Sequence, residues 1–393
     1  MRMRPPLALL LFLGLLGPLA AASAQVPAGQ QPARVQVVDS GLTRKPPAEQ
    51  GFDGLQYTSQ GFTLSNGVVR YGIDYHAYWD AEGKTAKPSP EGYLGMPLPT
   101  GCNWYHGGFM SVSFNGLNLG NIAPAVLRVV EQGQRGLIEL LWKTAEGQVR
   151  IRFLQEPEAD YLAAELAVLP TSEIRSLDLS LRCYPSYFTG WNKRDGWRQI
   201  IGPMTTTEQG QTKALDPLQD WWLLYQDRVF DYALNRDDSA GPCGLLYLPE
   251  QIKSVQVLPT SYPVTTNVTV KPTVRSVRLA FWEFPKKTNA ESLQRLRQGA
   301  AQVAEHLRQV DFSDSQVAAF DAAGERAALA AMIAKTKEPE AWRQRLAPML
   351  DQVAAAQQAY RSNDLSAEQT ASAALAKYRD AVWDLKFEAL LSD

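Results

Sequence analysis

The stretch from Val69 to Asp80 most constrains the fold, because apolar and polar residues alternate along its whole length. The apolar set includes Tyr71 and Tyr75, and the other set includes Asp74. A period of two with one apolar and one polar face is typical of a half-buried strand. Similar runs recur as far as Pro285, separated by turn residues. Many short strands without intervening helices predict a large antiparallel β-sandwich over residues 51–287.

The pattern changes at Thr288, where "TNAE" forms a capping box with Glu291 and apolar residues then recur every three or four positions. Further helix starts are predicted near Ser313, Pro339 and Ser366. The sequence therefore predicts a β-rich fold with an α-helical C-terminus. Residues 288–393 are expected to form a small helical bundle or arm.

The N-terminus has two arginines, then a short apolar run, then the small residues Ala22-Ser23-Ala24 at the position of a cleavage site. This order is typical of a cleaved secretory signal, which we assign to residues 1–24. The alternative is a retained N-terminal anchor. Residues 25–50 are rich in Pro, Ala and Gln and are expected to be a flexible leader. The mature chain is then exported, to the periplasm or the extracellular space, with no stable membrane insertion.

Composition excludes several classes of function. Apolar residues make up 45% of the chain and charged residues 20%, which suits a folded core, and a net charge of −2 without a basic block argues against nucleic acid. No P-loop, dinucleotide fingerprint, nucleophile elbow, HExxH or paired CxxC is present, so no cofactor is predicted. Three cysteines allow one bridge, Cys183 to Cys243 with Cys102 left over, or three buried thiols.

Two stretches suggest a site with histidine. Asp74 and His76 lie on the polar face of one predicted strand, where a carboxylate can orient an imidazole. The loop "GCNWYHGGFM" presents Trp104, Tyr105 and His106 among glycines. The alternatives are a solvated strand face and a tight connection with its rings on the core. A third alternative is a metal site formed by Asp74, His76 and His106.

The stretch "RCYPSYFTGWNKRDGWRQ", from Arg182 to Gln199, places aromatic rings among loop-forming residues. Sugar rings stack on aromatic faces, and their hydroxyls need polar partners. Packing as a lid on the core is the alternative. The candidate ligand-binding residues of this stretch are Tyr187, Trp191, Asn192, Arg194 and Trp197, with Asp195 as a candidate catalytic acid. Further along, Tyr225 and Asp227 share a predicted strand face and are candidates for binding and catalysis. The alternative is that Asp227 is one of several exposed acids at strand ends and turns.

The stretch "FTLSNGVVRYGIDYHAYWDAEGK", residues 62–84, resembles the opening hairpin of galactose-mutarotase-like β-sandwich domains of carbohydrate-active proteins. The resemblance implies a sandwich fold and a carbohydrate ligand. It carries over no catalytic residues, because the histidine motif and late glutamate of the sugar epimerases have no match here.

These features together predict an exported carbohydrate-binding or carbohydrate-processing protein, with hydrolase, lyase or epimerase chemistry as the reaction classes. The alternative is a non-catalytic envelope or extracellular scaffold that contacts proteins through its helical domain. A second apolar stripe with Trp383, Phe387 and Leu391 motivates that alternative.

Overall fold

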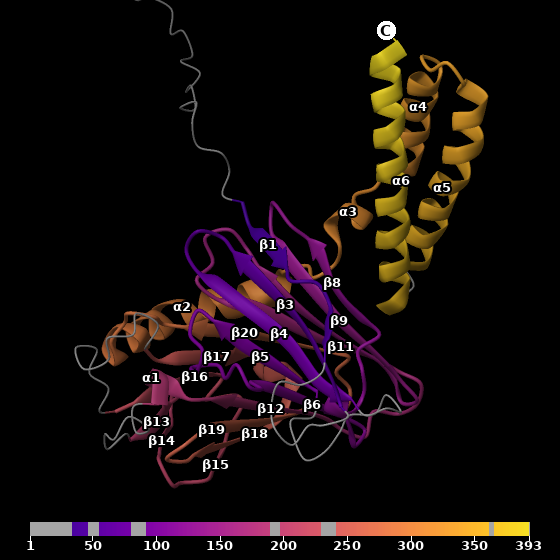
Figure 1. Ribbon diagram of the computed structural model, residues 1–393. Helices are drawn as coiled ribbons and strands as arrows, with labels where there is room; N and C mark the ends of the chain where they lie inside the picture. The colour runs from indigo at the N-terminus through magenta and orange to yellow at the C-terminus, as the bar shows by residue number, and fades with distance from the viewer. Residues whose placement is uncertain are drawn as a thin grey trace, which may run out of the picture. The chain divides into compact units, whose positions relative to one another are not determined.

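The computed structural model describes residues 34–45, 55–79, 92–188, 197–228, 241–360 and 365–392. Two antiparallel β-sheets stack face to face, and helices follow them in the chain (Figure 1). The predicted fold class, an antiparallel sandwich with a helical C-terminus, is confirmed.

The first sheet has 11 strands within the described residues, and β2 and β7 lie beside its main path. In spatial order the strands are β1 (Gln36–Asp39), β3 (Gln56–Ser65), β4 (Arg70–Trp79), β5 (Tyr93–Leu98), β6 (Met110–Phe114), β12 (Leu177–Cys183), β19 (Val264–Val270), β18 (Ile252–Pro259) and β15 (Lys213–Leu215), with β2 (Thr43–Lys45) on β3 and β7 (Leu117–Asn118) on β6.

The second sheet has nine strands within the same described residues. Their spatial order is β14 (Thr206–Glu208), β13 (Arg198–Ile201), β16 (Trp222–Asp227), β17 (Cys243–Tyr247), β20 (Ser276–Glu283), β11 (Leu162–Pro170), β10 (Gly147–Gln155), β9 (Gly136–Thr144) and β8 (Val126–Glu131). Short helical turns occur at η1 (Leu119–Asn121), α1 (Pro185–Phe188) and η2 (Pro249–Gln251).

The main core lies between the two sheets and follows directly from the alternation in the sequence. On β4, Tyr71, Ile73 and Tyr75 point inward and are buried, whereas Asp74 and His76 are only partly buried. The same period of two places Leu179 and Leu181 of β12 in the core. We call the opposite surface, which turns away from the second sheet, the outer face of the first sheet.

The outer face of the second sheet is covered by α2 (Asn289–Gln309). Leu296, Ala300 and Leu307 of this helix pack on Leu246 and Trp282 of the sheet in a second buried cluster. The predicted capping box is confirmed, since the Thr288 hydroxyl accepts from Glu291 N and the Glu291 carboxylate accepts from Thr288 N. This helix therefore completes the sandwich rather than the helical bundle.

The remaining helices are α3 (Ser315–Ala318), α4 (Ala322–Ile333), α5 (Pro339–Tyr360) and α6 (Leu365–Ser392). The predicted second helix is thus split into α3 and α4, because Asp314 and Asp321 each cap a separate helix start. A third apolar cluster, which includes Leu346, Leu350 and Leu385, holds these helices together.

Buried charges join α6 to the second sheet. The Arg152 guanidinium donates to Glu139 on β9 (2.8 Å) and to Glu368 on α6 (2.8 Å). Arg150 also donates to Glu368 (2.9 Å). Burial alone raises the pKa of Glu139, but Arg152 and Arg128 outweigh it, so the pKa of Glu139 lies below its ordinary value.

The N-terminal boundary of the sandwich differs from expectation. The predicted signal at residues 1–24 lies outside the described residues. The expected flexible leader contains β1 and β2, which both pair with β3. Val35 is buried and forms a bridge with Gly133, so apolar contacts draw this polar-looking stretch onto the sheet.

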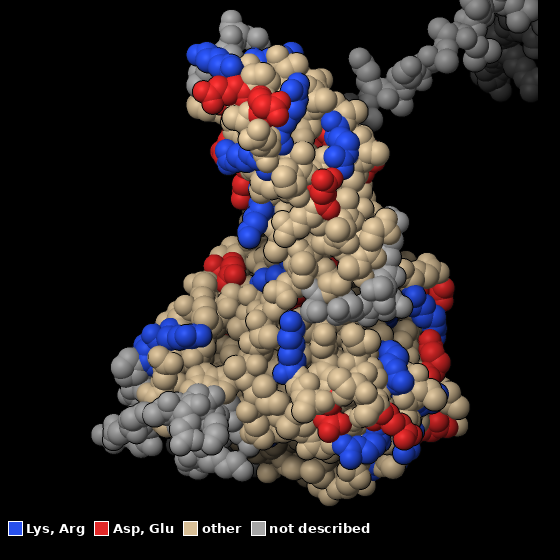
Figure 2. All heavy atoms as spheres, turned by 90° about the vertical axis from the view of Figure 1, so that its right-hand side faces the viewer, with Lys and Arg blue, Asp and Glu red and all other residues tan. Residues whose placement is uncertain are grey.

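Three further observations bear on the sequence-based expectations. The thiols of Cys102, Cys183 and Cys243 are buried and form no disulfide within the described residues, which corresponds to the alternative of three buried thiols. In the described part of the chain, no helix combines the length and apolar character needed to span a membrane. Figure 2 shows Lys and Arg interspersed with Asp and Glu over one face of the described residues.

Candidate functional site

The first sheet opens where β5 and β6 part from each other. Within the described residues, one pair, Leu94 with Met110, joins these two strands. Beyond it, Gly92 N donates to the Gly120 carbonyl of η1 (2.8 Å) rather than to β6. The separation leaves a hollow of about 250 Å³.

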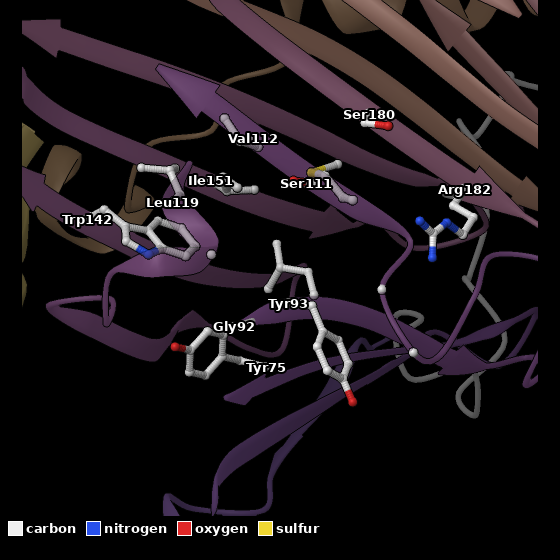
Figure 3. Close-up of a pocket in the computed structure, with 15 residues that line it drawn as sticks. Tyr75, Gly92, Tyr93, Ser111, Val112, Leu119, Trp142, Ile151, Ser180 and Arg182 are labelled. Carbon is white, nitrogen blue, oxygen red and sulfur yellow. The ribbon is translucent and has the colours of Figure 1, made fainter. Parts of the chain in front are cut away.

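The hollow reaches through the first sheet to residues of the second. Trp142 of β9 and Ile151 of β10 line it from the core side, and Ser111, Ser180 and Arg182 line it from β6 and β12 (Figure 3). In Figure 3, Trp142 and Leu119 lie at one end and Arg182 at the other. The lining residues are Tyr75, Gly92, Tyr93, Leu94, Gly107, Gly108, Met110, Ser111, Val112, Leu119, Gly120, Trp142, Ile151, Ser180 and Arg182.

Tyr75 contributes a buried hydroxyl to this lining. Its side chain is 3% exposed, and its Oη has no hydrogen-bond partner in the described part of the chain. Burial raises the pKa of Tyr75 far above its ordinary value, so the group stays a neutral hydroxyl at physiological pH. A buried hydroxyl without a partner costs free energy, which a hydrogen bond from a ligand would recover.

Arg182 stands between the hollow and a group of aromatic side chains. We call Tyr105, Tyr184 and Tyr262 the tyrosine cluster; the Tyr105 and Tyr184 ring centroids are 4.6 Å apart, and those of Tyr184 and Tyr262 are 4.9 Å apart. Burial raises the pKa of Tyr105 and Tyr184, and the positive charge of Arg182 opposes that rise in both. Arg182 therefore lies near the tyrosine cluster, whose members are not among the described lining residues.

The predicted loop Gly101–Met110 forms the adjoining rim. It crosses β5 so closely that a Cβ on Gly95 would lie 1.9 Å from the His106 carbonyl oxygen, so only glycine fits there. Gly107 and Gly108 of this loop line the hollow. His106 is exposed, and its Nδ1 lies 2.5 Å from the Gly101 carbonyl oxygen.

Glu283 of the second sheet anchors the start of this loop. Thr100 N donates to its Oε2 (3.0 Å) and Trp104 N donates to its Oε1 (3.2 Å). Burial raises the pKa of Glu283 to about 8, although these hydrogen bonds act in the opposite direction. The carboxyl group fixes the loop from the core, away from the hollow.

Asp74 and His76 lie on the same outer face, on the next strand. Nε2 of His76 is 3.6 Å from an Asp74 oxygen, and Nδ1 forms a hydrogen bond with the Tyr57 hydroxyl. The His76 ring stacks on Tyr93, with centroids 5.2 Å apart, and Tyr93 lines the hollow. Asp74 and His76 line a separate hollow with Ser59, whereas the rings of Tyr105 and His106 contact each other in the loop.

A metal site from Asp74, His76 and His106 is not formed. Among the described residues, no group of three or more His, Cys, Asp or Glu side chains is arranged to hold a metal ion. His76 and Asp74 instead use their polar atoms in the contacts with Tyr57 and with each other.

Trp104 and Tyr225 lie inside the core, which leaves no surface for a ligand. Both are 0% exposed, and their ring centroids are 5.4 Å apart. The Trp104 indole donates to the Trp282 carbonyl (2.9 Å), and the Tyr225 hydroxyl bonds with Thr266 (2.9 Å). Their positions correspond to the packing alternative.

Asp227 and Trp197 belong to the second sheet, away from the hollow. Asp227 is fully buried, pairs with Arg198 (3.2 Å) and accepts from Trp197 N (2.9 Å). The partly exposed Trp197 indole donates to Glu208, and the Arg228 guanidinium lies 5.2 Å from the centre of its ring. These contacts satisfy the polar groups of both residues.

Trp191, Asn192, Arg194 and Asp195 lie outside the described residues, as does the side chain of Tyr187.

Sequence reasoning missed the residues that line the hollow. Trp142 and Tyr75 sit in apolar alternation, so they resemble any core residue. Arg182 begins the aromatic stretch and alternates with Ser180 on β12, which indicates a polar strand face. The sequence pattern does not show that β5 separates from β6, and this separation forms the hollow.

Comparison with known protein families finds no family that matches this chain. Comparison with curated proteins finds no relative similar enough in sequence to be matched.

Proposed function

We propose that this protein is exported and binds carbohydrate in the hollow on the outer face of the first sheet. The observation that carries the proposal is a hollow with aromatic and hydroxyl side chains in one lining, among them Trp142, Ser111 and Ser180. Flat apolar walls with a few placed polar groups are what a small-molecule site requires. Sugars need both, since their C–H faces pack on rings and their hydroxyls form hydrogen bonds.

Two sequence features support the same proposal. The resemblance of residues 62–84 to galactose-mutarotase-like domains suggests a carbohydrate ligand, and the sandwich fold agrees with it. The signal-like N-terminus supports a periplasmic or extracellular location.

Hydrolase, lyase or epimerase chemistry would require a proton acceptor beside the bound sugar. Both ring nitrogens of His76 contact Tyr57 and Asp74, and His76 does not line the hollow, so we assign it no catalytic role. Binding alone is sufficient for the function proposed here.

Glycan-array screening of the purified full chain tests the proposal, with Ser111→Trp as the blocking variant. Ser111 is exposed, so a bulky side chain there should fill the hollow without disturbing the core. Ser254→Trp is the matched control, because Ser254 is an exposed serine on β18 of the same sheet. We expect saccharide binding that Ser111→Trp abolishes and Ser254→Trp preserves. No binding to any glycan, or equal binding by both variants, would overturn the proposal.

The second candidate function is a non-catalytic scaffold that contacts proteins through its helices. A stripe on α6 favours it, since Trp383, Phe387 and Leu390 are 71%, 60% and 76% exposed at helical spacing. The side chain of Leu391, which sequence reasoning placed in this stripe, lies outside the described set. If this candidate holds, Trp383→Glu with Phe387→Glu should abolish complex formation in light scattering and leave saccharide binding unchanged.

A further inference from the structure

We propose that the hollow selects an anionic saccharide, a sugar that bears a carboxylate or a sulfate, through Arg182 and Tyr75. This inference rests on the proposed function and specifies the chemical class of its ligand.

The charge of the lining supports an anionic ligand. Arg182 is the sole charged residue among the described residues that line the hollow, and the lining includes no Asp or Glu. No ion pair joins Arg182 to a carboxylate in the described part of the chain. Its neighbours across the strands are uncharged, since Thr265 pairs with it on β19. Among the described lining residues, a ligand that enters therefore meets one positive charge and no carboxylate.

The chemistry of arginine sharpens this argument. The planar guanidinium presents paired N–H donors that match carboxylate and sulfate oxygens. In Figure 3 the Arg182 guanidinium is directed toward the hollow, on the side opposite Trp142. Charge-assisted hydrogen bonds of this kind are about twice as strong as neutral ones, and stronger where water is partly excluded.

Tyr75 provides an independent second observation. Its hydroxyl is buried in the lining and lacks a partner within the described residues. Gly92 lies directly beside this buried hydroxyl, since a Cβ at that position would lie 3.1 Å from the Tyr75 oxygen. A ligand hydroxyl or ring oxygen would satisfy the group, whereas an apolar ligand would leave it unpaired.

The size of the hollow limits what enters. A volume of about 250 Å³ lies slightly below the range typical of sites for drug-sized ligands, and it suits one sugar ring. Trp142 and Leu119 then face the ring, while Arg182 at the far end reaches its acidic substituent. The rest of a longer chain would lie over the outer face of the sheet.

Isothermal titration calorimetry on the full chain tests the inference with three tetrasaccharides of equal length. The probes are a galacturonic acid oligomer, the neutral galactose oligomer and a sulfated galactose oligomer. We expect the neutral oligomer to bind about ten- to a hundredfold more weakly than at least one of the anionic oligomers, which corresponds to one or two charge-assisted hydrogen bonds. Comparison of the two anionic probes distinguishes a carboxylate from a sulfate.

Variants assign the preference to residues. Arg182→Gln should remove the preference for anionic over neutral oligomers, and Arg182→Lys should restore part of it. Arg70→Gln is the matched control, because Arg70 is also exposed on the first sheet but does not line the hollow. Tyr75→Phe should weaken binding of the anionic oligomer about two- to tenfold without lowering the melting temperature, because the missing hydroxyl has no partner in the free protein.

The outcomes separate the inference from the function on which it rests. Equal binding of neutral and anionic oligomers, unchanged in Arg182→Gln, overturns the inference and leaves carbohydrate binding intact. No binding of any oligomer overturns both. The inference is also overturned if Arg70→Gln removes the preference for anionic oligomers as fully as Arg182→Gln does. The preference would then come from the overall charge of the protein surface and not from Arg182 in the hollow.

Discussion

The outer faces of the two sheets differ in how their charges are used. On the second sheet, α2 covers the apolar part, and Arg152 pairs with Glu139 and Glu368 in full burial. On the first sheet, among the described residues, no helix packs on the outer face, and Arg182 lines a hollow without a carboxylate partner.

Under the proposed function, this difference would separate stability from recognition. Paired, buried charges hold parts of a fold in one arrangement and are expensive to break. An unpaired charge at a hollow contributes little to folding but retains its full capacity to bind an anion. Three predictions test whether the two faces divide these roles.

Arg152→Met should have the largest effect, because two buried carboxylates, Glu139 and Glu368, each lose one of their two arginine partners. We expect a loss of about 3–5 kcal/mol in the free energy of unfolding, measured by urea denaturation. Arg345→Met is the control, since its pair with Asp384 is about half exposed and should contribute at most about 1 kcal/mol. An equal loss in both variants would contradict the proposed role of the second face.

The second-largest effect should come from low pH, which should lower the free energy of unfolding through Glu139 on the second sheet. The pKa of Glu139 is lowered in the folded state, since Arg152 and Arg128 outweigh the opposing effect of burial, so its contribution is present above the unfolded pKa and is lost as pH falls through the folded pKa. Urea denaturation from pH 7 down to pH 3 should show a falling free energy of unfolding, with a shallower fall in Glu139→Gln. An identical pH dependence in the variant would show that Glu139 does not control it.

Arg182→Gln should have the smallest effect on stability. Its guanidinium is exposed and has no ion-pair partner in the described part of the chain, so the free energy of unfolding should change by less than about 0.5 kcal/mol. A thermal melt beside the wild type checks this. A clear loss of stability would indicate that Arg182 serves the fold, and it would weaken the contrast between the faces.

Much of the fold was predictable from local patterns. The alternation on β4 assigned Tyr71 and Tyr75 to the core and Asp74 to the outer face, as observed. The capping box at Thr288 located the start of α2. The role of α2 was not predictable, because an amphipathic stripe indicates that a helix is covered on one side and does not say by which element.

The candidate site was predictable only in part. The predicted residues His76, Tyr105 and His106 do not line the hollow themselves; His76 stacks on Tyr93, which does, and the loop of His106 contributes Gly107 and Gly108 to the lining. Trp104 was misleading, since its aromatic ring in a loop sequence is buried by a contact with the second sheet. The hollow itself depends on how distant strands pair, and no short stretch encodes that.

The parting of β5 and β6 has a consequence for how such a site changes over evolutionary time. The opening is made by the course of the main chain, so exchange of the surrounding side chains would alter what is admitted without closing it. New ligand preferences then become accessible by single substitutions, while the sandwich beneath is inherited unchanged.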